Sequence, residues 1–120
     1  MYRFIILFLA FGVQAHQMSP TYPEWTPSYM EDIYKTRVRI FNKREDVKYF
    51  QIGVFDKDFK PLPFVTQYHL RGVLFNSYAT FDIYINKNVM KDATYVCSES
   101  MLTDVVSSGV VSKICSKFKS

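Results

Sequence analysis

Strict alternation of apolar and charged residues constrains the fold of this chain more than any other feature. In residues 34–40, Tyr, Thr, Val and Ile alternate with Lys and Arg, and in residues 81–85 Phe and Ile alternate with Asp and Tyr. Successive side chains of a β-strand point to opposite faces, so this period-two pattern predicts strands with one buried face. The 120 residues include 11 Phe and 9 Tyr against 4 Gly, a composition that also favours strands.

Several further segments are expected to be strands or their connections. The polar run at 42–46 predicts a turn, so residues 33–41 and 47–55 are expected to form an antiparallel hairpin. Residues 56–64, with two prolines, are expected to carry the chain to a second sheet. The remaining strands are expected to be a short one that ends near Gly72 and three longer ones within 78–86, 93–100 and 109–118. About seven short antiparallel strands predict an all-β, immunoglobulin-like β-sandwich.

The first fifteen residues have the pattern of a secretory signal. Arg3 precedes an apolar run from Phe4 to Val13, and Val13 and Ala15 are small residues at the positions that a signal peptidase reads. The alternative is a membrane anchor, but this run is about half of the ~20 residues that a spanning helix needs. We therefore expect residues 1–15 to be a cleaved signal and residues 16–120 to be one periplasmic or secreted domain, with no membrane span in the mature chain.

Two cysteines, Cys97 and Cys115, lie in the last two expected strands. Because an oxidising compartment makes a disulfide the usual state of such a pair, we expect them to be bonded to each other. The alternative is two buried free thiols. The net charge of +4 becomes +3 without Arg3 and is spread along the chain, which argues for solubility and against a nucleic-acid partner.

The segment that follows the signal is rich in proline and aromatic residues. Pro20, Pro23 and Pro27 each lack an N–H, which excludes a helix and a central strand over residues 18–30 and favours an extended strand at a sheet edge. Three aromatic side chains of this segment are candidates either for packing under the edge or for contacting a partner: Tyr22, Trp25 and Tyr29.

The same segment resembles the start of the periplasmic pilus chaperones of Gram-negative bacteria. The residues that carry the resemblance are Ser-Pro-Thr at 19–21, the alternating strand that ends at Asn42, and Tyr95 in "ATYVCSES". It covers the first, immunoglobulin-like domain of those two-domain proteins, and small phage-encoded exported proteins share the pattern. The resemblance implies that the chain captures an unpaired strand of another protein by edge addition, with Tyr95 in a strand that pairs with the partner.

The chain departs from this family at two points. Tyr22 stands where the family has the arginine that grips the client's terminal carboxylate, and the resemblance extends over only the first of the family's two domains. Carboxylate anchoring is therefore not expected.

Catalytic and metal-binding patterns are scarce. Cleavage after Ala15 would place His16 at the N-terminus, where its amine and imidazole, joined by His69, would form a three-nitrogen brace suited to Cu(II). This copper site is a remote alternative, and we otherwise expect no cofactor and no catalytic residues.

The sequence therefore predicts an exported, non-catalytic protein-binding or assembly module, chaperone-like, that recognises a polypeptide through a sheet edge. The expected contact residues are Tyr22, Trp25, Tyr29 and Tyr95. The alternative function is a structural component of a phage particle or of the cell envelope.

Overall fold

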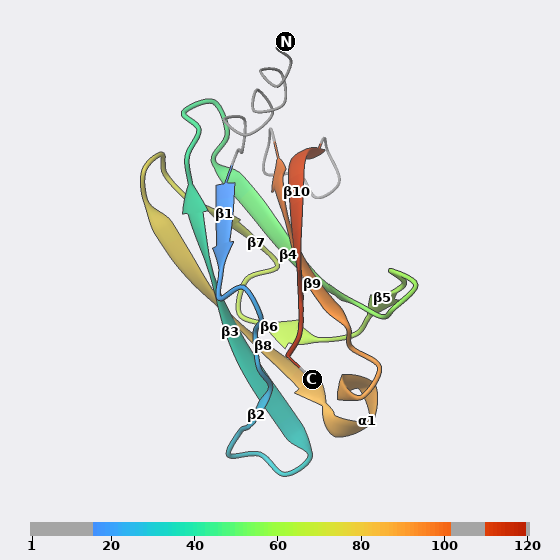
Figure 1. Cartoon of the computed structure of the whole chain (residues 1–120). Helices are drawn as coiled ribbons and strands as arrows, with labels where there is room; N and C mark the ends of the chain where they lie inside the picture. The colour runs from blue at the N-terminus through green and yellow to red at the C-terminus, as the bar shows by residue number, and fades with distance from the viewer. Residues whose placement is uncertain (1–15, 102–109, 120) are drawn as a thin grey trace.

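The computed structural model describes residues 16–101 and 110–119. These residues form two antiparallel sheets of five strands each, packed face to face (Figure 1). The predicted all-β, immunoglobulin-like sandwich is therefore confirmed. The predicted signal segment, residues 1–15, lies outside the described residues.

The first sheet is built around two long strands, β3 (Ile33–Asn42) and β8 (Tyr78–Asn86), which pair along their length. β1 (His16–Ser19) and β2 (Thr26–Pro27) pair with the other side of β3. β6 (Val65–Thr66) pairs with the other side of β8.

The second sheet has β9 (Tyr95–Met101) at its centre. On one side β9 pairs with β10 (Val110–Lys117), and on the other with β4 (Tyr49–Phe55). Two short strands, β5 (Pro61–Leu62) and β7 (Leu70–Gly72), pair with the far side of β4. The predicted short strand that ends near Gly72 is β7.

The core lies between the inner faces of the two sheets. The alternation identified the buried residues of the long strands correctly: Val38 and Ile40 in β3, Phe50, Ile52 and Val54 in β4, and Phe81, Ile83 and Ile85 in β8. The basic residues between those of β3 lie on the exposed outer face. Burial of these apolar faces stabilises the sandwich.

The predicted hairpin between residues 33–41 and 47–55 is wrong. β3 pairs with β1, β2 and β8, whereas β4 pairs with β5, β7 and β9 of the other sheet. Residues 43–48 therefore cross the end of the sandwich instead of closing a hairpin. Both strands bury one face, and a local pattern cannot distinguish strands that pair from strands that face each other across a core.

Asn42 holds the crossing segment, residues 43–48, in place through hydrogen bonds of its side chain. Its side chain is fully buried, and its Nδ2 donates hydrogen bonds to the carbonyl oxygens of Val47 (2.6 Å) and Val73 (2.8 Å). Its Oδ1 accepts a hydrogen bond from the backbone N–H of Arg44 (2.9 Å). One side chain thus joins the crossing segment to the connection between β7 and β8.

The N-terminal segment runs along a margin of the first sheet, as predicted, but in two pieces. β1 begins at His16, earlier than expected, and ends immediately before Pro20, which has no N–H to donate. The chain returns to β3 only at β2. The single strand expected over residues 18–30 is therefore two short strands separated by residues 20–25.

The predicted disulfide is confirmed. Cys97 and Cys115 lie opposite each other in β9 and β10, with their sulfur atoms 2.08 Å apart. The bond joins residues 18 apart in sequence, a loop for which cross-linking contributes about 3 kcal/mol to stability.

The described helix is a single turn, α1 (Lys87–Met90). It starts after Asn86, whose side chain accepts a hydrogen bond from the N–H of Asn88 (2.8 Å). Over residues 16–101 and 110–119, no helix has the length and apolar character needed to cross a membrane.

We predict that Asn42→Ala lowers the free energy of unfolding by about 2–4 kcal/mol, because two buried carbonyl oxygens lose their donor. Urea unfolding measures this change. Asn88→Ala is the matched control, since Asn88 is exposed, and should change stability by less than about 0.5 kcal/mol. Equal stability of the two variants would show that Asn42 does not hold the crossing.

Candidate functional site

The two flanks of the sandwich differ in how their strand margins are covered. On one flank the marginal strands are β5, β6 and β7, which have two, two and three residues. Very short edge strands offer few backbone groups to an incoming chain. Pro61 and Pro63 on the same flank lack an N–H.

Side chains cover part of the β8 margin that β6 leaves uncovered. Arg71 donates from Nη1 to the carbonyl of Thr80 (3.1 Å), and Thr66 donates from Oγ1 to the carbonyl of Asp82 (2.8 Å). These carbonyls are therefore already satisfied. This flank is poorly suited to strand addition.

The opposite flank carries β10, an eight-residue strand. Within the described residues, β10 pairs only with β9. The Cα atoms of Cys97 and Cys115 are 4.0 Å apart, near the short spacing of a non-hydrogen-bonded antiparallel pair. The backbone N–H and C=O groups of Cys115, and by alternation those of Lys113 and Lys117, therefore point away from β9.

The side chains of β10 also alternate. Lys113, Cys115 and Lys117 are exposed, whereas Ser112, Ile114 and Ser116 are half-buried. Beside Ile114 the structure has a hollow of about 330 Å³ between β10 and the β1–β3 margin, lined also by Gln17, Met18, Ser19, Arg39 and Phe41. β10 thus presents an open backbone next to a shallow groove.

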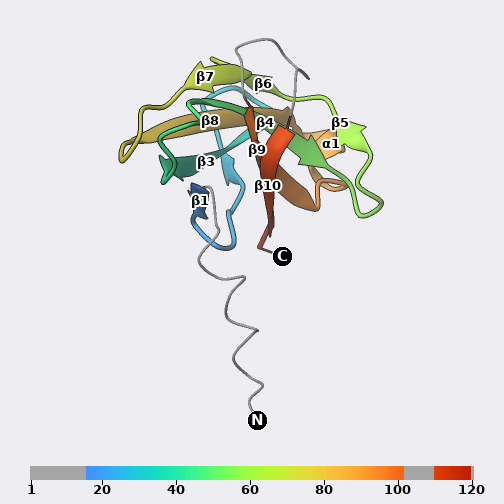
Figure 2. The same cartoon turned by 90° about the horizontal axis from the view of Figure 1, so that it is seen from above.

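His16 joins the two sheets on this flank. Its ring is fully buried, with Nε2 2.8 Å from Oγ of Ser98 and Nδ1 3.0 Å from Oγ of Ser112. The Ser112 hydroxyl is also 2.7 Å from that of Ser100. The imidazole packs edge-on against Phe50, at a centroid distance of 5.1 Å. His16 thereby links β1, a marginal strand of the first sheet, to β9 and β10 of the second. β1 and β10 lie near each other in Figure 2.

Burial lowers the pKa of His16 below its ordinary value of 6.5, and a hydrogen bond with Ser98 opposes this shift. The neutral ring suits the site, since one nitrogen donates and the other accepts, and a hydroxyl can take either role. The groups in contact with the ring are serine hydroxyls and Phe50, so no carboxylate among these contacts stabilises the imidazolium.

We predict that the protein loses stability as the pH falls below about 6.5. The unfolded chain then binds a proton at residue 16 that the folded chain resists, so the free energy of unfolding falls towards acid and is fully retained above pH 6.5. Thermal unfolding between about pH 5 and pH 7.5 measures the effect. The slope should shrink in His16→Gln and persist in His69→Gln, which alters an exposed ring. An unchanged slope in His16→Gln would contradict the assignment.

Three of the four predicted contact residues lie near the end of β10, around Lys117. Tyr22 is exposed and lines a hollow with Lys117. Trp25 lines a second hollow with Lys117, and Tyr95 is opposite Lys117 in the β9–β10 register. Tyr29, which is 99% exposed, instead lies beside Pro63 and Val65 near β6. The structure therefore does not unite all four residues in one surface.

The expectation that Tyr95 lies in an edge strand is wrong. β9 is paired on both sides, so its backbone is not open to a partner. The ring of Tyr95 stacks on Phe59 at a centroid distance of 4.3 Å on the outer face of the second sheet. The unpaired strand is its neighbour, β10.

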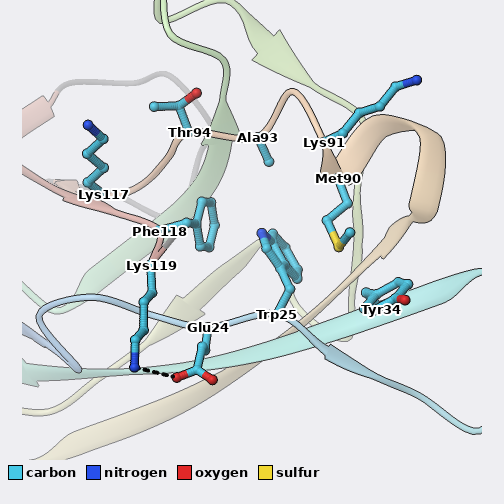
Figure 3. Close-up of a pocket in the computed structure, with 10 residues that line it drawn as sticks. All are labelled: Glu24, Trp25, Tyr34, Met90, Lys91, Ala93, Thr94, Lys117, Phe118 and Lys119. Atoms are coloured by element: carbon cyan, nitrogen blue, oxygen red, sulfur yellow. Dashed lines mark ion pairs between the residues drawn. The ribbon is translucent and has the colours of Figure 1, made fainter.

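Trp25 is partly buried and serves packing. Its ring tilts against Phe118 at a centroid distance of 4.6 Å, and its buried Nε1 has no hydrogen-bond partner in the described residues. A hollow of about 550 Å³ lies next to this pair. Lys91, Lys117 and Lys119 are among the residues that line it (Figure 3). Glu24 forms an ion pair with Lys119 at 3.3 Å.

The two histidines of the alternative copper site have separate surroundings. Both ring nitrogens of His16 contact serine hydroxyls, whereas His69 is exposed and packs on Phe64 at 5.2 Å. In the part of the chain that the structure describes, no three His, Cys, Asp or Glu side chains gather as a metal site.

The open margin is β10, a strand that the sequence pattern did not predict to be at an edge. Lysine at alternate positions of a strand, here Lys113 and Lys117, is a common protection of edge strands and was the available signal. His16 was interpreted only as a metal ligand. No local pattern indicates that its ring contacts serines 82 and 96 positions away.

Comparisons with known proteins extend this picture at the level of the fold. No family model and no curated protein matches the chain. Among solved structures, it is similar to the crystal structure of the periplasmic chaperone SfaE, with a TM-score of 0.54 and 14% sequence identity. The match covers 87% of this chain and 56% of that chain, so the chain spans little more than half of the chaperone's length. The likeness to a periplasmic chaperone suggested by the sequence is thus confirmed for the fold.

Proposed function

We propose that this chain is an exported, non-catalytic module that binds another polypeptide by adding the partner's strand to β10. The observation that carries the proposal is that the marginal strands differ in length and in how far their outer sides are covered. Among the described marginal strands, β10 is the one longer than four residues, and its outer side has no strand partner. The other margins are short, and the β8 margin is partly covered by side chains.

The chemistry of β10 fits strand addition. Outward N–H and C=O groups at Lys113, Cys115 and Lys117 repeat every second residue, the spacing at which an antiparallel or parallel strand offers its own groups. Main-chain hydrogen bonds then supply affinity, and pockets for alternate side chains supply specificity. The hollow beside Ile114 would take an inward side chain of the added strand.

Residues at the end of β10 would extend the contact. Tyr22 offers an exposed ring beside Lys117, and tyrosine contributes large contact area at protein interfaces. Tyr95 would contribute through its side chain alone.

The exported location is supported by two observations. The chain has a disulfide, which persists in oxidising compartments, and its fold is similar to that of a periplasmic chaperone. We propose that the protein acts in the periplasm or after secretion.

The test compares Lys113→Pro with Lys113→Ala. Both variants remove the lysine side chain, but only proline removes the outward N–H, and proline is tolerated where an edge N–H faces away from the sheet. We expect a partner that co-purifies with the natural protein from its own cells to be retained by Lys113→Ala and reduced about tenfold by Lys113→Pro.

Thermal unfolding and disulfide formation must be unchanged in both variants. Equal recovery of the partner with Lys113→Pro and Lys113→Ala would show that the β10 backbone is not the binding surface.

A further inference from the structure

A second exposed surface lies where the chain turns from β7 into β8. The bulky residues of this surface, here called the apolar tip, are Leu74, Phe75 and Tyr78, together with Tyr68 from the connection between β6 and β7. Arg71, the neighbour of Tyr68, reaches the carbonyl of Thr80 in β8. Leu74 is 69% exposed and Tyr78 59%. The connection between β7 and β8 projects at one margin of the molecule in both views (Figures 1 and 2). The turn itself lies away from β10, although Arg39, whose guanidinium lies over the Tyr78 ring, also lines the hollow beside Ile114.

The turn that carries Leu74 and Phe75 is well hydrogen-bonded. The N–H of Ser77 donates to the carbonyl of Leu74 (3.1 Å), and the N–H of Asn76 donates to the carbonyl of Asn42 (2.8 Å). Asn76 has a positive φ of 64°, which asparagine tolerates better than most residues. The two apolar side chains are thus held outward by a defined turn, although exposed apolar clusters are unfavourable in water and mark interaction sites.

Positively charged side chains lie next to the aromatic rings of the apolar tip. The Arg39 guanidinium lies 4.4 Å from the ring centroid of Tyr78, and that of Arg71 lies 5.6 Å from the ring centroid of Tyr68. The adjacent crossing segment adds exposed Lys43 and Lys48.

Acidic residues near the tip only partly offset this charge. Asp46 of the crossing segment forms an ion pair with Arg44, and Glu45 is the other carboxylate of that segment. The tip and its neighbouring turn therefore carry an excess of positive charge around a protruding apolar pair.

We propose that the apolar tip docks on the surface of a bilayer that contains anionic phospholipid. Leu74 and Phe75 enter the boundary between headgroups and acyl chains, where apolar side chains of peripheral proteins bind. Tyr68 and Tyr78 lie at headgroup depth, which suits rings with one polar end. Arg39 and Arg71 contact lipid phosphates.

The charge pattern favours a lipid surface over an uncharged partner. The groove near β6 is also apolar, with Tyr29, Met30 and Val65 among its lining residues, but none of its lining residues is charged. It therefore lacks the cations that an anionic surface attracts, and it supplies the internal control.

The experiment places a fluorescent reporter at each surface of the full chain. In a Trp25→Phe background, Leu74→Trp reports on the tip and Met30→Trp on the uncharged groove. On addition of vesicles of phosphatidylglycerol and phosphatidylethanolamine, we expect the emission of Leu74→Trp to shift to shorter wavelength and that of Met30→Trp to stay unchanged. Phosphatidylcholine vesicles should have a much smaller effect. Because the reporter is local, binding through residues 1–15 alone would not shift it.

A second pair of variants tests the roles of the side chains. Leu74→Ser with Phe75→Ser should weaken co-sedimentation with the anionic vesicles about tenfold or more, because both apolar groups that enter the membrane are lost. Arg39→Gln should weaken binding mainly at low salt. An unshifted Leu74→Trp, or equal shifts at positions 74 and 30, would overturn the proposal. A tip that binds a protein instead of lipid would give the first of these results.

Discussion

Burial of one face of every long strand against the opposite sheet is the constraint from which the remaining structure follows. The inner side chains of four strands pack in a shared core: those of β3 and β8 in one sheet and of β4 and β9 in the other. The backbone groups of these strands are also used, because each strand is hydrogen-bonded to a neighbour on both sides over at least part of its length. Backbone recognition is then possible only at the margins, and side-chain recognition only on the outer faces and the ends. The two surfaces that we single out, the β10 margin and the apolar tip, are of these two kinds.

Two buried polar side chains determine how the sheets meet. Asn42 satisfies carbonyls at the end where the chain crosses between sheets, and His16 connects serine hydroxyls on the β10 flank. Apolar packing alone tolerates small shifts of one sheet over the other, whereas a buried hydrogen bond is lost when its partner moves and then leaves a costly unpaired group. These two residues therefore give the packed sheets a specific alignment.

The alternation of side chains was sufficient to predict the strands and the core, because a period of two is a local property of the chain. It predicted the inner faces of β3, β4 and β8, and the two cysteines predicted the pairing of β9 with β10. It could not predict that β3 and β4 lie in different sheets, since pairing and facing strands share one pattern. Which strand has an open margin depends on which strands pair. The strand of Tyr95 was therefore expected to pair with a partner, although the open strand is its neighbour β10. The environment of His16 depends on contacts between residues more than 80 positions apart, which no local pattern reports.

The covered flank limits how this protein can assemble. That flank is formed by β5, β6 and β7 and by the side chains of Thr66 and Arg71. A chain with two adhesive margins can bind a neighbour at each and propagate into a fibre. Here one flank has a long strand with an unpaired side, whereas the strands on the other flank are short and partly covered by side chains. When a partner's strand adds to β10, this protein therefore offers no second site for strand addition on its other flank. Complexes formed in this way are finite, so the protein would end a growing stack of strands instead of prolonging it.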